Sequence, residues 1–513
     1  MTRPATVTAT TPTGVPPRAG RRQWAALVVL MLPVLLVSVD NTVLSFALPE
    51  ISTALQPSAA GQLWIVDVYS LVLAGLLVAM GSMGDRFGRR KLLLTGASGF
   101  AVVSVLAAFS TSAEQLITAR AVLGFFGAMI MPATLSLLRS TFLDREQRRL
   151  AIAVWASGFA AGSALGPIVG GVLLEHFAWG SVFLVAVPVL VPLLIAGPLL
   201  LTESRDPAPG PADPFSVLLS LAAMAPVVAA IKLLATDGFV WPVAALALVG
   251  VGSGWLFVRR QLARPRPLLD VRLFTNPVFA GSVLVNLLAV VALVAFLFFT
   301  TQHLQLVVGL RPLQAALTLV PGLAVMILAG LGVVRVVRWL RPRTIVAIGL
   351  ASAALAYAAV FATAGAPVVV FVVAFAFVGL GVGAAETISN DLIIAAVPAN
   401  RAGAASAVSE TAYEVGAVLG TAVLGSMLTA IYRGALVVPA GVPTEAGEAA
   451  RETLGGAVAV SDGLPDSLAG PLLHAATDAF DHGLVATAGV GALVMVAAVV
   501  VALTTLRRAS SAD

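Results

Sequence analysis

Eight ionisable side chains lie inside stretches of sequence that are otherwise apolar, and their types could support chemistry on protons or cations. They are Asp40, Asp67, Arg120, Lys232, Glu386, Asp391, Glu410 and Glu414. An ionisable side chain inside a membrane-spanning helix costs roughly 2.5–3.5 kcal/mol on insertion scales, so such residues are functional candidates by default. Six of the eight are acids, which can hold either a proton or a cation.

Asp40 lies 16 residues into an apolar run that begins near residue 24, which is about 24 Å along a helix. Ser38, Asn41 and Thr42 flank it and could line a wet cavity. Because bases are scarce inside the apolar runs, we expect Asp40 to face such a cavity rather than to pair with a buried base.

Glu410 and Glu414 are four residues apart, so they share one face of a helix, with Tyr413 between them. Burial of a carboxyl group favours its protonated form, and a nearby lipophilic cation favours the ionised form and expels the proton. Competition for one carboxylate is therefore a complete minimal mechanism of exchange. Asp67 could take part in this exchange of a proton for a cation, or it could be an ordinary interfacial acid.

The other four ionisable residues carry weaker signals. Arg120 lies about a turn inside its run, where it could organise water or bind an acid, or extend to the interface. We expect Lys232 to be interfacial. We expect Glu386 and Asp391, near the end of another run, to be structural or to serve in gating.

Two glycine-rich motifs stand beside these residues. The segment 81–91 (GSMGDRFGRRK) predicts a tight turn between two helices, in which Asp85 could cap a neighbouring helix or pair with a distant arginine. Its motif residues are Gly81, Asp85, Arg86, Gly88, Arg89 and Arg90. The segment 162–171 (GSALGPIVGG) predicts a bendable helix that packs closely on a neighbour. Its motif residues are Gly162, Gly166, Pro167, Gly170 and Gly171.

The elements that must position these residues are membrane-spanning helices. The chain has 513 residues, of which 59% are hydrophobic and 11% charged, and its mean hydropathy is +1.00. Soluble proteins have about 45–50% apolar and about 25% charged residues, so a soluble enzyme is excluded. Fourteen runs are long enough to span a bilayer. They lie near 24–47, 62–82, 92–110, 115–138, 150–173, 179–201, 215–235, 241–258, 278–300, 313–333, 344–364, 367–389, 403–431 and 483–506.

Basic residues predict the orientation of these spans. If the N-terminus is cytoplasmic, 25 of the 30 basic residues fall in cytoplasmic segments. We therefore expect a multi-pass protein of the plasma membrane with both termini in the cytoplasm. The same clusters form no continuous basic face, so nucleic acid is not expected as a partner.

The runs divide into two groups of six with a hairpin between them, as in transporters with two related halves. The expected parts are a disordered tail (1–22), a first bundle (23–201), a loop (202–214), the hairpin (215–258), a second loop (259–277), a second bundle (278–506) that includes an extracellular loop (433–480), and a tail (507–513). The halves share little sequence beyond hydropathy.

The motifs together resemble the major facilitator superfamily, and within it the fourteen-helix drug:proton antiporters. The turn at 81–91 and the glycine series at 162–171 match two of its motifs. Arg120 with Gly124 and Gly127, and Asp40 with Thr42, Ala47, Leu48 and Pro49, match two more. One departure is Met326, in a run where a member of this family carries an acid, and this disfavours dications with well-separated charges.

The resemblance implies an all-α fold and a proton-driven exporter of lipophilic cations, dyes and quaternary ammonium compounds. It assigns proton or cation binding to Asp40, Asp67, Glu410 and Glu414. The expected partners are such cations, protons and membrane lipids, and the expected state is a monomer without a cofactor. Alternatives are an exporter of a single antibiotic or metabolite, a proton-coupled importer, and a receptor or scaffold that transports nothing. An ATP-driven pump is not expected, since no GxxxxGK[ST] segment occurs.

Overall fold

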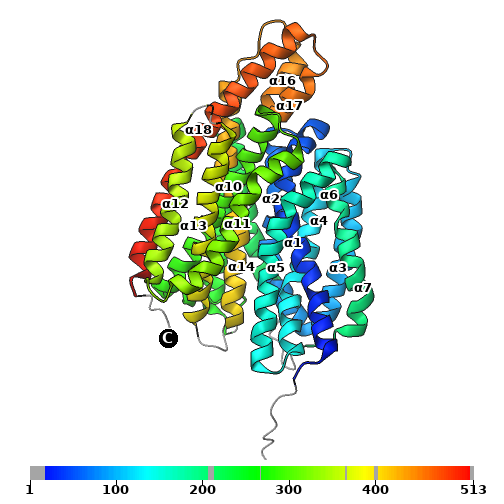
Figure 1. Ribbon diagram of the computed structural model, residues 1–513, viewed down its shortest axis with the longest axis vertical. Coiled ribbons are helices and arrows are strands. Elements are labelled where there is room, and N and C mark those ends of the chain that lie inside the picture. Colours follow the sequence, from blue (N-terminus) through cyan, green and yellow to red (C-terminus); the bar gives the residue numbers. More distant parts are fainter. Residues whose placement is uncertain are drawn as a thin grey trace, which may run out of the picture.

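Two bundles of long helices stand side by side in the computed structural model (Figure 1). The structure describes residues 18–205, 213–265, 267–363, 365, 367–397 and 402–508. Most of the expected N-terminal tail, residues 206–212 of the loop at 202–214, and residues 509–513 of the C-terminal tail lie outside the described residues. We call the end at which the first helix begins the inner end, and the opposite end the outer end.

The first bundle contains seven helical segments, three of which begin at a side-chain cap. They are α1 (Arg21–Leu55), α2 (Ala59–Phe87), α3 (Arg89–Ala108), α4 (Ala113–Thr141), α5 (Arg145–His176), α6 (Ser181–Leu184) and α7 (Ala186–Leu200). Ser58, Ser112 and Asp144 accept hydrogen bonds from backbone amides in the first turns of α2, α4 and α5.

The hairpin between the bundles is made by α8 (Pro214–Asp237) and α9 (Trp241–Ala263). α8 packs on α2 of the first bundle and also on η4 and α15 of the second, whereas α9 packs on α8. α8 therefore bridges the two bundles.

The second bundle begins after a short 3-10 helix, η1 (Val271–Thr275). Its elements are α10 (Pro277–Gln302), η2 (His303–Val307), α11 (Pro312–Val336), α12 (Pro342–Ala362), α13 (Val368–Ala395), α14 (Ala402–Leu419), η4 (Gly420–Gly425), α15 (Ser426–Ala435), α16 (Thr444–Glu452), α17 (Leu454–Ser461), α18 (Asp466–Thr505) and η5 (Leu506–Arg508). The elements η2 and η4 are π-helices, a rare form that often marks functional sites.

The two bundles repeat one packing scheme. α1 packs on α5 as α10 packs on α14, α2 packs on α4 as α11 packs on α13, and α3 packs on α7 as α12 packs on α18. Between the bundles, α2 packs on α14 and α5 packs on α11. The packing thus contains a repeat that is faint in the sequence.

Each of the fourteen predicted runs coincides with helical structure, so the all-helical membrane fold is confirmed. Among the described residues, thirteen helices are long and apolar enough to cross a membrane. The remaining run, 150–173, lies in α5, which is 32 residues long and whose described apolar part, Leu165–His176, is shorter than a span.

The expected extracellular loop at 433–480 is largely helical. α16, α17 and the first turns of α18 rise above the bundles at the outer end (Figure 1). The Tyr432 hydroxyl donates to the Ala450 carbonyl at 2.6 Å. A Cβ at Gly455 would come within 2.6 Å of Ser52 Cβ, so α17 lies directly on α1 of the first bundle.

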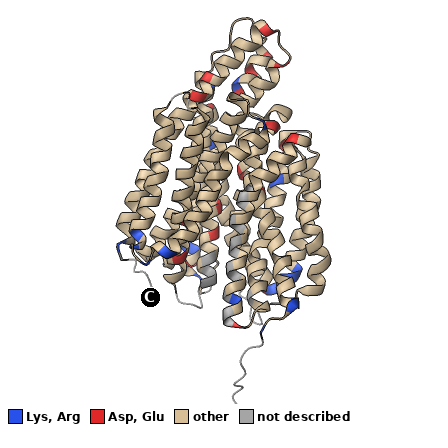
Figure 2. Cartoon of the chain, viewed as in Figure 1, with Lys and Arg blue, Asp and Glu red and all other residues tan. Residues whose placement is uncertain are grey.

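Charge is distributed unevenly along the long axis. Lys and Arg gather near the inner end, whereas the helices between the two ends are almost free of charge (Figure 2). α1 begins and α18 ends at this same inner end (Figure 1). The chain therefore crosses the bundle region an even number of times.

Candidate functional site

Asp40 and Arg120 form a buried ion pair inside the first bundle. Arg120 NH1 lies 2.7 Å from Asp40 Oδ2, and the side chains are 2% and 9% exposed. Arg120 Nε also donates to the Ile65 carbonyl of α2 at 3.2 Å. The expectation that Asp40 lacks a basic partner is thus wrong, and Arg120 is buried and binds an acid. The Thr42 hydroxyl donates to carbonyls of its own helix, and the Asn41 side chain lies outside the described residues.

Tyr69 connects this pair to the second bundle. Its ring lies against the guanidinium, with 4.6 Å from Arg120 Cζ to the ring centroid. Its buried hydroxyl has no hydrogen-bond partner among the described residues and lies within electrostatic range of Asp40, Arg120 and Glu414. Glu414 is 7% exposed and extends from α14. Acids of both bundles thus approach one tyrosine.

Glu386 of α13 belongs to the same region. Tyr413 lies within electrostatic range of both Glu386 and Glu414. Glu410 is half-buried one turn before Glu414 on α14. Asp391 is exposed near the end of α13. We call Asp40, Arg120, Tyr69, Glu386, Tyr413 and Glu414 the central polar cluster.

The glycines of α5 hold Asp40's helix in place. A Cβ at Gly162, Gly166 or Gly170 would lie 2.6, 1.9 or 2.6 Å from side-chain atoms of α1. Side chains at these three positions would push α1 and α5 apart. Gly171 faces the other way, and its Cβ would lie 2.7 Å from Leu313 Cα of α11. The series therefore packs α5 against both its own bundle and the other.

Asp67 is paired with a base as well. Lys232 Nζ of α8 lies 2.9 Å from Asp67 Oδ2, and both side chains are 1% exposed. The ammonium also sits 3.8 Å from the centroid of the Trp64 ring. The interfacial position expected for Lys232 is wrong, because the hairpin packs on α2 and covers it.

The turn at 81–91 is bound within its own bundle. Asp85 accepts from Arg89 at 2.8 Å, and among the described residues it neither caps a neighbouring helix nor pairs with an arginine of the other bundle. Glu203 takes the capping role, since its carboxylate accepts from the amides of Arg90 and Lys91 at 3.0 and 3.2 Å. Gly88 has a φ of 112°, and a Cβ there would lie 2.7 Å from the Glu203 carboxyl carbon.

Four polar contacts join the outer ends of the two bundles. Gln62 donates to Gln302 at 3.1 Å, and Gln305 donates to the Phe46 carbonyl at 3.1 Å. The remaining two are the Arg311–Glu175 ion pair at 2.8 Å and a hydrogen bond of 2.7 Å from the Ala59 amide to Glu452. The molecule is thus fastened across its outer end.

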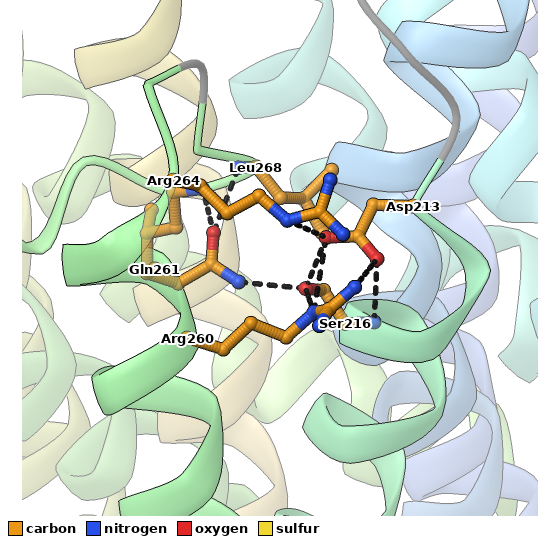
Figure 3. Close-up of polar contacts among 7 residues, drawn as sticks. Asp213, Ser216, Arg260, Gln261, Arg264 and Leu268 are labelled. Carbon is orange, nitrogen blue, oxygen red and sulfur yellow. Dashed lines mark hydrogen bonds and ion pairs between the residues drawn. The ribbon is translucent and has the colours of Figure 1, made fainter.

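A second ion cluster fixes the inner end of the hairpin (Figure 3). Asp213 caps α8 and accepts from Arg260 of α9 at 2.9 Å, while Gln261 donates to Ser216 at 2.9 Å. Burial alone would raise the pKa of Asp213, but hydrogen bonds from Arg260 and Ser216 outweigh it and lower the pKa to about 2. Asp213 is therefore ionised throughout the physiological range.

The sequence contained no clear signal for several of these residues. Three of them are neutral, namely Gln62, Trp64 and Tyr69. The fourth, Glu203, lies outside the conspicuous motifs. Their position gave a weak signal for Trp64 and Tyr69, because they stand three residues before and two residues after Asp67.

Comparison with known proteins places these features in context. Residues 30–421 match the family model of the Major Facilitator Superfamily. The chain is 55% identical to the multidrug efflux pump LfrA of Mycolicibacterium smegmatis, over 96% of this chain and 98% of that protein. It is 35% identical to the methyl viologen resistance protein SmvA of Salmonella typhimurium, over 93% and 97%. Among solved structures, an inward-facing bacterial homologue of the human lysosomal transporter Spinster has the same fold, with a TM-score of 0.66 at 20% identity, over 96% of this chain and 100% of that chain.

Proposed function

The chain belongs to the major facilitator superfamily, and we propose that it is a proton-coupled antiporter exporting lipophilic cationic drugs, dyes and quaternary ammonium compounds across the bacterial plasma membrane. One observation carries the proposal: buried acids of both bundles, Asp40 and Glu414, lie within electrostatic range of Tyr69. The names of LfrA and SmvA support the export of drugs and of a cationic substrate class.

The Asp40–Arg120 pair acts as the proton-sensitive contact. A proton on Asp40 cancels its attraction for Arg120, which keeps its contacts with Tyr69 and the Ile65 carbonyl. Loss of a buried ion pair shifts the balance between two packings of α1 and α4 by several kcal/mol. Proton binding at one carboxylate can therefore drive a change of conformation.

The acids of the second bundle take the substrate cation. Tyr413 lies within electrostatic range of Glu386 and Glu414 and supplies an aromatic ring near them, and Glu410 lies one turn before Glu414 on α14. A cation that binds there favours ionised carboxylates, and protons that bind there favour its release. Asp391, being exposed, is left to a role in gating at the inner end.

Orientation and gating follow from the two ends. The basic inner end faces the cytoplasm, and both termini lie there. The four contacts at the outer end must break for substrate to leave, and α16 and α17 form part of this outer gate. The 81–91 turn supports the inner end from within the first bundle. The monomer remains the proposed working unit.

The proposal is tested in everted membrane vesicles with an acidic interior. Ethidium is added, and proton efflux is followed with a pH-sensitive dye for wild type, Asp40→Asn and the matched control Asp466→Asn, which changes an exposed aspartate of α18. We expect ethidium to dissipate the gradient in wild type and control but not in Asp40→Asn. If no lipophilic cation dissipates the gradient in wild-type vesicles, the proposal is wrong.

A further inference from the structure

The Lys232 ammonium is held as a cationic ligand would be held. It contacts the Asp67 carboxylate at 2.9 Å and the face of Trp64 at 3.8 Å. A carboxylate beside an aromatic ring is the arrangement by which proteins recognise ammonium ligands. All three groups come from described residues of two helices, α2 and α8, and the lysine reaches the site from the hairpin.

This site lies where the two bundles and the hairpin meet. Thr421 of η4, in the second bundle, is beside the Asp67 carboxylate. Apolar side chains of all three elements seal the site, namely Leu71, Val228, Val418 and Ala422. Separation of the bundles at their outer ends would break this seal, because Leu71 and Ala422 belong to different bundles.

Polar contacts anchor the hairpin on the inner side of the site. The Asp213–Arg260 cluster fixes its inner end (Figure 3), and Ser220 donates to the Gly75 carbonyl of α2 at 3.1 Å. Beyond Lys232, α8 ends at Gly238, where an added Cβ would meet nothing within 4 Å. The lysine's flexible four-carbon stem thus extends from the outer half of α8, beyond these polar contacts.

We propose that Trp64 and Asp67 form a second cation-binding subsite near the outer end, and that Lys232 occupies it as a tethered competitor of the transported cation. The inference rests on the proposed function. When the outer contacts open, a departing lipophilic ammonium or aromatic cation can contact Asp67 and Trp64. The Lys232 ammonium, present at a high effective concentration, displaces it and takes its place. An exporter gains from this, because its outward site then binds external cation weakly.

The test measures ethidium binding to purified protein in detergent by fluorescence. Lys232→Met keeps an unbranched side chain one atom shorter and removes the charge. Lys232→Gln removes the charge while its amide can still donate to Asp67. Lys91→Met is the matched control, because Lys91 is the only other lysine in the chain and is exposed. We expect both Lys232 variants to bind ethidium about tenfold more tightly, as for loss of a competitor worth one cation–π contact, with no change in the control.

A double variant separates this role from a purely structural one. Asp67→Asn added to Lys232→Met removes both charges, and we expect it to lose the gain in affinity while unfolding at a higher temperature than Lys232→Met. If Lys232→Gln folds but binds ethidium no more tightly than wild type, the inference is wrong and the proposed function stands. If wild type and all variants neither bind nor transport ethidium or any other lipophilic cation, the inference and the proposed function both fall.

Discussion

Two acids inside the apolar helices form buried ion pairs, Asp40 with Arg120 and Asp67 with Lys232. The sequence identifies all four residues by their position in apolar runs. It does not predict the pairs, because a pair depends on how each helix is rotated against its neighbours. Bases are scarce in the apolar runs, and this scarcity suggested that the acids would be unpaired. The two bases among the eight ionisable residues, Arg120 and Lys232, are nevertheless both paired with acids.

Removing one partner of the Asp40–Arg120 pair should destabilise the fold more than removing both partners. We predict that Arg120→Met lowers the free energy of unfolding by about 3–5 kcal/mol, because it leaves a buried carboxylate unpaired. Asp40→Asn combined with Arg120→Met should recover much of that loss without restoring transport. Thermal unfolding in detergent measures the first effect and vesicle assays the second. Equal stability of the single and double variants would contradict this account.

Asp213 should have no part in proton coupling. Its pKa of about 2 lies below the ordinary value of 3.8, so its stabilising effect is complete above about pH 4 and is lost only as the pH falls toward 2. We predict that Asp213→Asn lowers the melting temperature equally at pH 5 and pH 8 and leaves the pH profile of transport unchanged. A destabilisation that shrinks between pH 8 and pH 5 would argue against the pair with Arg260.

At the scale of elements, the sequence predicts nearly every helix, because runs of about 20 apolar residues have few other uses. It does not predict the helices at 444–461 or the outward extension of α18, since their composition resembles a solvated loop. It also misses the π-helix η4, whose extra residue per turn has no signature in hydropathy. The glycine series of α5 predicts a seam, and the structure adds that its partner is the segment of α1 that carries Asp40.

That seam gives a sharp test. We predict that Gly166→Ala impairs transport strongly and costs about 1–3 kcal/mol in stability, because its Cβ would lie 1.9 Å from Thr42 Oγ1. Gly252→Ala is the matched control, because Gly252 lies in α9 and a Cβ there meets nothing within 4 Å. Ethidium efflux and thermal unfolding are measured for both. Similar effects at the two positions would show that helix propensity, and not the seam, decides the outcome.

At the scale of the whole molecule, the distribution of basic residues predicts which end of the bundles is the inner end. The two bundles repeat one packing scheme, although the two halves of the sequence share little beyond hydropathy. The conformation in which the two bundles are joined at their outer ends could not be predicted from the sequence. It depends on contacts between distant helices, such as the one between Gln62 and Gln302. These contacts fasten the outer end, and they must open in each transport cycle if the account is correct.

The natural chain has no cysteine, so thiols can be introduced in pairs without a background. We predict that Gln62→Cys with Gln302→Cys, joined by a short bifunctional thiol reagent, stops ethidium efflux, because the bundles can no longer separate at their outer ends. A reducible reagent should allow efflux to resume after reduction, and each single variant should be insensitive. Full transport by the cross-linked protein would exclude an outer gate at this position.

The central claim is that a proton and a cation compete for the same carboxylates, and proton release on cation binding tests it most directly. Ethidium is added to purified protein in weakly buffered detergent solution between pH 6 and pH 8, and bound ethidium and released protons are recorded together. We predict saturable release in step with binding for wild type, and weaker binding with less proton release for Asp40→Asn combined with Glu414→Gln, because this variant removes two of the carboxylates in the competition. Saturable binding to wild type with no proton release at any pH in this range would contradict the account.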